Sequence, residues 1–146
     1  MYLTVQGIPK AQPRVKARAF KVGNVCRVSM YTPDGAKEWK TAIVEACKVQ
    51  MAEGDFIGKG KSIGITVEFR MPRPKSHFGS RKGVAYLKDS APAFHTGKPD
   101  IDNLLKAVFD ALNELLWHDD SQITAVAADK VYGVEPGMTI WIAEGV

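Results

Sequence analysis

The chain has 146 residues, of which 45% are hydrophobic, and it carries a formal net charge of +4 at pH 7. This length and apolar content predict a single globular domain spanning residues 1–146. The sequence contains no run of about 18 apolar residues, so it predicts no membrane-spanning helix and no membrane partner. The net positive charge favours a polyanionic partner.

Two further features bear on the cellular compartment. Residues 1–12 lack the basic start and apolar run of a secretory signal, which predicts a cytoplasmic protein. Cys26 and Cys47 have neither CxxC spacing nor a nearby histidine pair. We therefore interpret both as free, buried thiols in a reducing compartment.

The N-terminal part combines a strand with a basic segment. Residues 2–8 alternate in polarity, which predicts a strand closed by Pro9. Residues 9–20 then contain two prolines and no acidic residue, which predicts an exposed arm. This arm is either a solvated loop or a contact for DNA phosphates. Its candidate DNA-binding cations are Lys10, Arg14, Lys16 and Arg18.

The next segments predict the framework of the fold. Residues 20–31 suggest a short hairpin that turns at Gly23 and Asn24. Thr32, Pro33 and Asp34 have the side chains of a helix start, and the helix is expected to run to about Ala52. Residues 62–71 alternate in polarity and predict a strand in the middle of the sheet, with one face packed on helices.

Residues 72–99 form a long basic segment rich in proline and glycine, interpreted as a loop insertion. Aromatic residues are interleaved with its cations, a mixture that suits phosphates and exposed bases. The alternative is a poorly ordered surface insertion. His77 and His95 have no ligand-spaced partner, so we interpret them as loop histidines. The candidate DNA-binding residues of this segment are Arg73, Lys75, Arg81, Lys82 and Lys98.

Residues 97–123 hold the acidic residues that need a chemical explanation. Pro99 places the helix start after it, with Asp102 or Asn103 as the N-cap, and the helix is expected to have about fourteen residues. Asp100 and Asp102 lie two residues apart and point the same way if the chain is extended there. The polar positions share one stripe of the helix, namely Asp102, Lys106, Asp110 and Asn113.

A second acidic pair, Asp119 and Asp120, follows the helix and precedes a predicted strand at residues 121–131. If these carboxylates met Asp100 and Asp102 they would repel one another, unless a divalent cation such as Mg²⁺ joined them. A helix of this length separates the two groups by roughly 20 Å, which argues against their meeting within one chain. The alternative is that Asp102 only caps a helix and that Asp119 and Asp120 only form a turn.

The block KPDIDNLLKAVFDALNELLWHDDSQI, residues 98–123, resembles the RusA family of Holliday junction resolvases of bacteria and phages. The pattern D-x-D-N-L-x-K-x-x-x-D-A-L followed by D-D-x-Q carries the resemblance. Lys130 and the proline- and arginine-containing segment after the first strand are also similar. The spacer before the acidic pair is about one residue shorter than in the best-known members, which leaves open whether Asp119 or Asp120 faces a metal.

The resemblance implies a set of roles. Asp100 and Asp102 match the paired catalytic aspartates, Asp120 the third, and Lys106 the essential lysine. It also implies Mg²⁺, for which Mn²⁺ would substitute, and a homodimer that cuts two strands of a four-way DNA junction. In such a dimer one ligand, Asp119 or Asp120, could come from the other chain.

We therefore predict an α+β domain with a mixed sheet of four to six strands and two main helices on one face. The predicted function is resolution of Holliday junctions in DNA recombination and repair, with the metal activating water for attack on a phosphodiester. One alternative is a related nuclease acting on flaps or forks. Others are a branched-DNA-binding module without catalysis and a basic structural protein with an acidic dimer seam.

Overall fold

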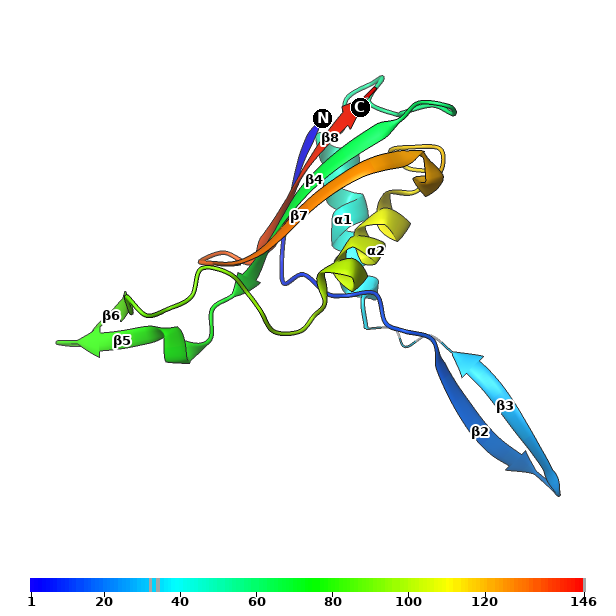
Figure 1. Cartoon of the computed structure of the whole chain (residues 1–146), viewed down its shortest axis with the longest axis horizontal. Helices are drawn as coiled ribbons and strands as arrows, with labels where there is room; N and C mark the ends of the chain where they lie inside the picture. The colour runs from blue at the N-terminus through cyan, green and yellow to red at the C-terminus, as the bar shows by residue number, and fades with distance from the viewer. Residues whose placement is uncertain (32, 34, 146) are drawn as a thin grey trace.

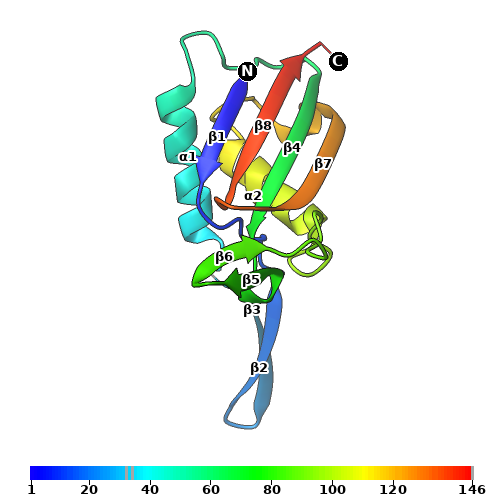
Figure 2. The ribbon, with the colours of Figure 1, turned by 90° about the vertical axis from the view of Figure 1, so that its left-hand side faces the viewer.

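The computed structural model describes residues 1–31, 33 and 35–145. Its centre is a four-stranded mixed sheet in the order β1-β8-β4-β7, covered on one face by two helices (Figures 1 and 2). The strands are β1 (Tyr2–Gln6), β4 (Ile63–Pro72), β7 (Ile123–Gly133) and β8 (Gly137–Glu144). The helices are α1 (Lys37–Gln50) and α2 (Ile101–Leu112). The predicted α+β class, with two helices on one face of a mixed sheet, is confirmed.

The direction of pairing changes across the sheet. β4 pairs in parallel with β7, whereas β8 is antiparallel to both β4 and β1. A parallel neighbour requires a crossover connection, and the chain makes it through α2. As a result α2 begins near the Pro72 end of β4 and delivers the chain back to the Ile123 end of β7 (Figure 1).

The core lies between the sheet and the helices. The predicted central strand β4 buries alternate residues Ile63, Ile65, Val67, Phe69 and Met71. α2 contributes a broad apolar face, including the fully buried Leu104 and Leu112, and α1 contributes Trp39 and Ile43. Each such side chain stabilises the fold by about 1.5–3 kcal/mol relative to an exposed position. The strand prediction for residues 62–71 and the apolar face predicted for α2 are confirmed.

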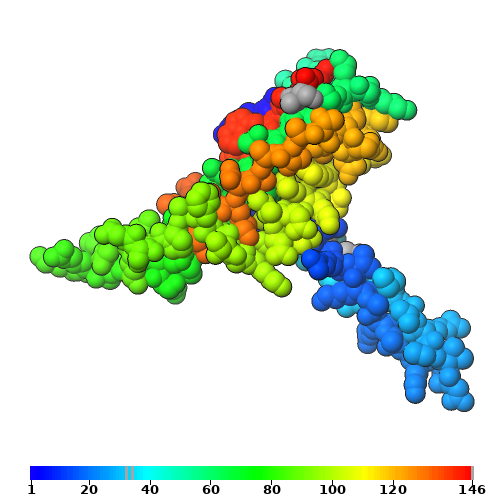
Figure 3. Space-filling model, in the orientation of Figure 1, coloured from blue at the N-terminus to red at the C-terminus, as the bar shows by residue number. Residues whose placement is uncertain are grey.

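Two hairpins project from the body at the end where α2 begins (Figures 1 and 3). The first arm is the hairpin of β2 (Lys16–Val22) and β3 (Val25–Tyr31). The second arm is the hairpin of β5 (Phe78–Arg81) and β6 (Val84–Leu87), preceded by the short 3-10 helix η1 (Lys75–His77). The first hairpin turns at Gly23, as predicted, but its first strand begins at Lys16, inside the segment interpreted as an irregular arm.

The structure corrects the interpretation of residues 72–99 as an insertion without secondary structure. Phe78 to Leu87 form an antiparallel ladder that turns at Lys82 and Gly83, both with positive φ. The strands have only four residues each, and β5 contains glycine and serine, so no clear polarity alternation marks them. The prolines on both sides of residues 78–87 favoured a loop, and no polarity pattern opposed that interpretation, although these residues form a hairpin.

Helix boundaries and thiols also differ from expectation. α1 begins at Lys37 after Ala36, and the predicted starting residues Thr32 and Asp34 lie outside the described part of the chain. Asp100, rather than Asp102 or Asn103, stands at the N-cap of α2, which has 12 residues.

The two thiols differ in burial. Cys47 is buried, and burial raises the pKa of its thiol. Cys26 is exposed on β3, so the expectation of a buried thiol was wrong there.

The face of the sheet opposite the helices is open to solvent. Tyr2 on β1 and Trp141 on β8 lie there as register partners, with ring centroids 5.6 Å apart. No helix among the described residues is long and apolar enough to cross a membrane.

Candidate active site

The start of α2 presents acidic side chains at the surface. Asp100 has extended backbone angles (φ −71°, ψ 142°), and its main-chain carbonyl accepts a hydrogen bond from the Leu104 amide at 3.1 Å. Its carboxylate makes no capping hydrogen bond to the helix, and half of the side chain is exposed. The Asp100 carboxylate is therefore not used to hold the helix and remains accessible to a ligand.

The segment before Asp100 is fixed to the edge strand β7. The His95 amide donates to the Lys130 carbonyl at 2.9 Å, and the Tyr132 amide donates to the Ala93 carbonyl at 2.8 Å. Phe94 and Val131 form an antiparallel bridge between these two bonds. The chain therefore approaches α2 as a short added strand, which sets the direction in which Asp100 emerges.

Lys130 completes this attachment from its position on β7. Its Nζ donates to the main-chain carbonyls of Gly97 and Pro99, each at 2.6 Å. These two carbonyls flank the cis bond between Lys98 and Pro99, immediately before Asp100. Hydrogen bonds from a charged group are stronger than neutral ones. Lys130 therefore acts as a clamp on the backbone that carries the first acidic residue.

A hollow of about 520 Å³ lies beside Asp100. Its lining includes Arg14 and Lys98, two of the predicted DNA-binding residues, together with Ala11, Pro99 and Asn103. The Arg14 guanidinium lies 4.0 Å from the Asp100 carboxylate, and both side chains are at least half exposed. Ion pairs this exposed contribute little, so Arg14 leaves the carboxylate available while adding positive charge at the rim.

Asp102 and Lys106 lie one turn apart on the exposed side of α2, in the polar stripe predicted for this helix. In the described part of the chain neither side chain has a hydrogen-bond or ion-pair partner. The stripe continues to Asp110, whose carboxylate accepts a hydrogen bond from Lys40 of α1 at 2.9 Å. Asp110 thus joins the two helices, whereas Asp102 and Lys106 are free to bind a ligand.

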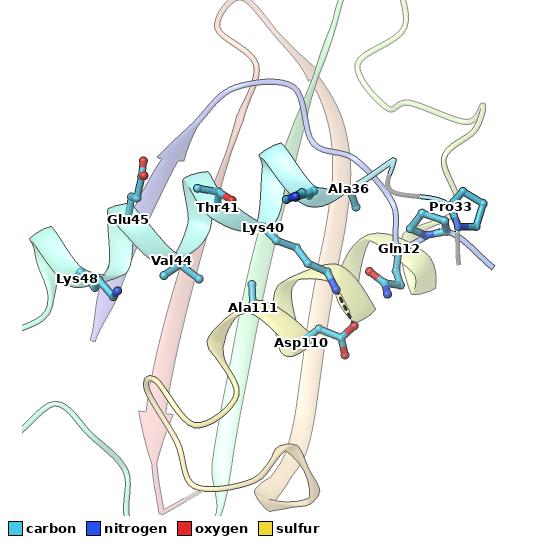
Figure 4. Close-up of a pocket in the computed structure, with 12 residues that line it drawn as sticks. Gln12, Pro33, Ala36, Lys40, Thr41, Val44, Glu45, Lys48, Asp110 and Ala111 are labelled. Carbon is cyan, nitrogen blue, oxygen red and sulfur yellow. Dashed lines mark hydrogen bonds and ion pairs between the residues drawn. The ribbon is translucent and has the colours of Figure 1, made fainter. Parts of the chain in front are cut away.

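The Lys40–Asp110 pair lies in a groove of about 840 Å³ along α1 and α2 (Figure 4). Gln12, Thr41, Val44 and Ala111 also line this groove. In this groove the carboxylate of Asp110 is already paired with Lys40, and neither Asp100 nor Asp102 lines it. We therefore place the acidic site at the start of α2 and not in this groove.

The second acidic pair separates into two different roles. Asp119 caps the short 3-10 helix η2 (Asp120–Gln122), because its carboxylate accepts a hydrogen bond from the Ser121 amide at 2.8 Å. The side-chain oxygen of Gln122 accepts a hydrogen bond from the Asp119 amide at 3.0 Å, and its side-chain nitrogen donates to the Gly58 and Lys61 carbonyls. The hydrogen bonds from Ser121 hold the pKa of Asp119 below its ordinary value.

Asp120 is exposed and, among the residues that the structure describes, makes no polar contact with its carboxylate. Like the side chain of Asp102, that of Asp120 is therefore not needed for local structure. The fixed turn around Gln122 nevertheless holds its backbone in place. Of the two candidates for the third acidic position, Asp120 is therefore the one whose carboxylate is available.

The two acidic groups do not meet within one chain. Asp119 and Asp120 precede the Ile123 end of β7, whereas Asp100 emerges beside Lys130, seven residues further along that strand, so they lie roughly 20 Å apart. Figure 1 shows α2 running the length between them. Among the described residues no three His, Cys, Asp or Glu side chains lie close enough to hold a metal ion.

The predicted DNA-binding cations fall mainly on or near the two arms. Lys16 and Arg18 are exposed on β2, and Arg81 and Lys82 are exposed at the turn of the second arm. Lys75 and Lys98 are exposed at the bases of the second arm and of α2, respectively. Lys10 pairs with Glu38 at 3.4 Å at the surface. The described structure thus places positive side chains on both sides of the α2 start.

Arg73 differs from the other predicted cations because it is built into a cluster around Tyr132. Its guanidinium lies 5.3 Å from the Tyr132 ring centroid and donates to the Pro92 carbonyl at 2.8 Å. His77 and His95 pack against the same ring, with centroids 4.7 and 4.8 Å away. Burial, and then the charge of Lys130, lower the pKa of His95. The cluster therefore joins the second arm to β7, and the two residues interpreted as loop histidines pack against Tyr132.

Comparison with known proteins identifies the family to which the chain belongs. A family model described as Endodeoxyribonuclease RusA matches residues 6–143. The chain belongs to the RusA endodeoxyribonuclease family. It is also 32% identical, over 97% of its length, to the uncharacterized protein YqaN of Bacillus subtilis (strain 168), and covers 94% of that relative. Membership of the RusA family implies nuclease activity of the Holliday junction resolvase type on branched DNA.

The sequence interpretation missed the contacts that position Asp100. Lys130 was noted only as a point of similarity to the RusA family, and Tyr132 was not noted at all. The available signal was a single lysine followed two residues later by an aromatic residue near the end of the predicted strand. Such a pattern does not reveal which carbonyls the lysine binds, because the partners, Gly97 and Pro99, lie 33 and 31 residues away in sequence.

Replacing Lys130 with methionine is expected to release the backbone before Asp100. Two charge-assisted hydrogen bonds would be lost while the aliphatic part of the side chain is kept, at a cost of about 1–3 kcal/mol in the free energy of unfolding. Hydrogen exchange should accelerate at residues 97–104 more than elsewhere in the chain. Lys48→Met, at the exposed end of α1, is the matched control. Equal exchange at residues 97–104 in the wild type and in Lys130→Met would contradict the clamp.

The capping role of Asp119 predicts a specific pH dependence. Because the folded pKa is lowered, the ionised carboxylate stabilises the native state at pH values above its ordinary pKa. That contribution is lost as the pH falls through the folded pKa, below about pH 4. Asp119→Asn keeps a capping oxygen but cannot titrate, so the free energy of unfolding should fall less steeply in this range.

Urea unfolding between pH 3 and pH 7 measures this difference. Asp120→Asn is the control, because Asp120 has no recorded hydrogen bond among the described residues, and its curve should match the wild type. A wild-type curve that both variants reproduce would show that Asp119 is not the titrating cap.

Proposed function

We propose that this chain is a Mg²⁺-dependent endodeoxyribonuclease that resolves four-way DNA junctions by paired, symmetric cuts during recombination and repair. We propose further that it works as a homodimer. Membership of the RusA family supports the reaction class. The observation that carries the proposal is the position of two accessible carboxylates, Asp100 and Asp102, between two basic arms; Asp100 makes only an exposed ion pair with Arg14.

This arrangement suits phosphodiester cleavage better than simple DNA binding. Carboxylates repel phosphates, so a protein that only bound DNA would lose affinity by placing Asp100 beside Arg14 and Lys98, with Asp102 two residues further on. A divalent cation reverses that repulsion. Carboxylate oxygens are the ligands that Mg²⁺ and Mn²⁺ prefer, and these side chains are exposed and not used to cap the helix.

We assign a role to each acidic residue and to the lysine of α2. Asp100, Asp102 and Asp120 would hold the metal ion, which supplies an activated water and stabilises charge on the phosphate oxygens. Lys106, one turn after Asp102, would face the charge that develops on those oxygens. Asp119 would support Asp120 by fixing the backbone of the turn.

A single chain offers only part of this carboxylate set, because Asp120 lies at the far end of β7 from Asp100. We therefore propose that each site takes Asp100 and Asp102 from one copy and Asp120 from a second copy. A two-fold dimer would then carry two equivalent sites, which matches the two strands that must be cut in a junction. The dimer would be required for cleavage.

The first test compares a synthetic four-way junction with a flap, a fork and a linear duplex of the same sequences. With Mg²⁺ or Mn²⁺ the wild type should cut the junction in symmetric pairs, and with EDTA it should bind without cutting. Asp102→Asn should lower the cleavage rate at least roughly a hundredfold. Its affinity for the junction in EDTA should be equal or higher, because the substitution removes a negative charge.

Asp129→Asn provides the matched control, because Asp129 is exposed on β7 and the change in net charge is the same. It should cleave as the wild type does. If the wild type cut the flap or the fork faster than the junction, that DNA structure would be the substrate in place of the four-way junction. Junction binding without cleavage in either metal would indicate a binding module and contradict the nuclease proposal.

The shared site makes a sharper prediction for mixed dimers. Chains carrying both Asp100→Asn and Asp102→Asn should be inactive alone, and so should chains carrying Asp120→Asn. When the two are co-expressed, one site of each mixed dimer receives three intact carboxylates. An equal mixture should therefore nick junction strands at roughly a quarter of the wild-type rate per chain.

Differently tagged chains allow the mixed dimer to be isolated before the assay. A site built within one chain gives the opposite result, because both sites of the mixed dimer then lack a carboxylate. Failure of the mixed dimer to nick, with wild-type mixtures active after the same purification, would contradict completion of the site across the dimer.

A further inference from the structure

The first arm contributes nothing to the core and is exposed along its whole length. All 14 residues of β2 and β3 are exposed, and the hairpin projects away from the sheet and helices (Figures 1 and 3). The two strands pair without interruption from Lys16 and Tyr31 to Val22 and Val25. A two-stranded hairpin is only marginally stable alone in water. A ligand on one of its faces would therefore order and stabilise it.

The register gives the arm two chemically different faces, because side chains alternate along each strand and paired residues share a face. One face carries cations and aromatic rings in three cross-strand pairs and ends in an apolar pair at the turn: Lys16 with Tyr31, Arg18 with Ser29, Phe20 with Arg27, and Val22 with Val25. The opposite face is mostly apolar, with Ala17 beside Met30, Ala19 beside Val28, and Lys21 beside Cys26. No acidic residue occurs between residues 16 and 31.

The basic–aromatic face is hollowed between its rings. Arg18, Phe20, Ser29 and Tyr31 line a concave surface of about 510 Å³. Phe20 is 42% exposed and Tyr31 is 47% exposed, so both rings are accessible. Ser29 is small, and this leaves space between the two larger side chains. Exposed rings beside cations are the combination that binds nucleotides whose bases are not stacked in a duplex.

The base of the arm leads directly to the acidic site. The Gln12 amide donates to the Asn103 carbonyl in the first turn of α2 at 2.8 Å, and Arg14 lies 4.0 Å from the Asp100 carboxylate. Only one residue separates Arg14 from the start of β2. A DNA strand that follows the arm toward the body would therefore bring its phosphates to Asp100.

We propose that the basic–aromatic face of the first arm binds unstacked nucleotides at the branch point of the DNA. Arg18 and Arg27 hold phosphates, and Phe20 and Tyr31 stack on bases that the branch leaves exposed. In linear duplex the bases are stacked on one another and offer the rings no partner, so this face distinguishes branched from linear DNA. The inference rests on the proposed junction nuclease activity and assigns its substrate selection to named residues.

Binding in EDTA, without cleavage, tests this assignment. In a Phe20→Leu/Tyr31→Leu variant, which keeps apolar bulk but removes both rings, affinity for a four-way junction should fall about tenfold. Affinity for linear duplex, which depends on cations, should change less than about twofold. Phe20→Tyr/Tyr31→Phe keeps both rings and should bind the junction as the wild type does.

The opposite face supplies the matched control. Val28→Thr/Met30→Gln changes two exposed residues of the same hairpin at similar size, and junction affinity should be unchanged. 2-Aminopurine placed at the branch point gives a direct readout. Its fluorescence should be altered by the wild type and by the ring-keeping variant, and altered less by the leucine variant.

Three results would overturn the inference. The first is equal loss of junction and duplex binding in the leucine variant, and the second is wild-type junction binding in that variant. The third is loss of junction binding in Val28→Thr/Met30→Gln alone, which would make the apolar face the contact surface. Cleavage of the same junction by the wild type in Mg²⁺ is measured in parallel. If the wild type cleaves and the leucine variant still binds normally, only the role of the arm is wrong.

Discussion

The parallel pairing of β4 with β7 is the constraint on which the placement of the site depends. Antiparallel neighbours could be joined by a tight turn, but a parallel neighbour obliges the chain to return along the whole sheet before it pairs. α2 makes that return, so its two ends stand at opposite ends of β7. Asp100 and Asp120 are consequently separated by topology, whatever their distance in sequence. The same crossover leaves the α2 start beside the base of both arms.

Local interactions then decide which acidic side chains remain available. Asp119 is engaged by Ser121 and Asp110 by Lys40, whereas Asp102 and Asp120 have no recorded polar partner among the described residues. The backbone at both acidic positions is nevertheless fixed, by Lys130 in one case and by Gln122 in the other. The chain therefore holds its free carboxylates on rigid supports, which is the arrangement expected of groups that act on a bound substrate.

Sequence patterns were sufficient for features that depend on local periodicity. They identified β4 as a central strand and α2 as a helix with a broad apolar face, and they singled out Asp100, Asp102 and Lys106 by motif. They did not identify β8, although its buried Met138, Ile140 and Ile142 alternate, and they missed the second arm between its prolines. The contacts of Lys130 depend on chain segments brought together only by folding, so no local pattern reports them. The capping by Asp119 is local, because its partners Ser121 and Gln122 follow within three residues, but an acidic pair before a strand does not by itself tell which carboxylate forms the cap.

The complete exposure of the first arm has a consequence for how this domain can change over time. Because β2 and β3 bury no side chain, residues can be inserted, removed or exchanged there without creating a cavity or a clash in the core. The sheet, α2 and the acidic residues can stay constant while the arm varies in length and composition. Selectivity for the shape of the DNA can therefore diversify independently of both stability and chemistry.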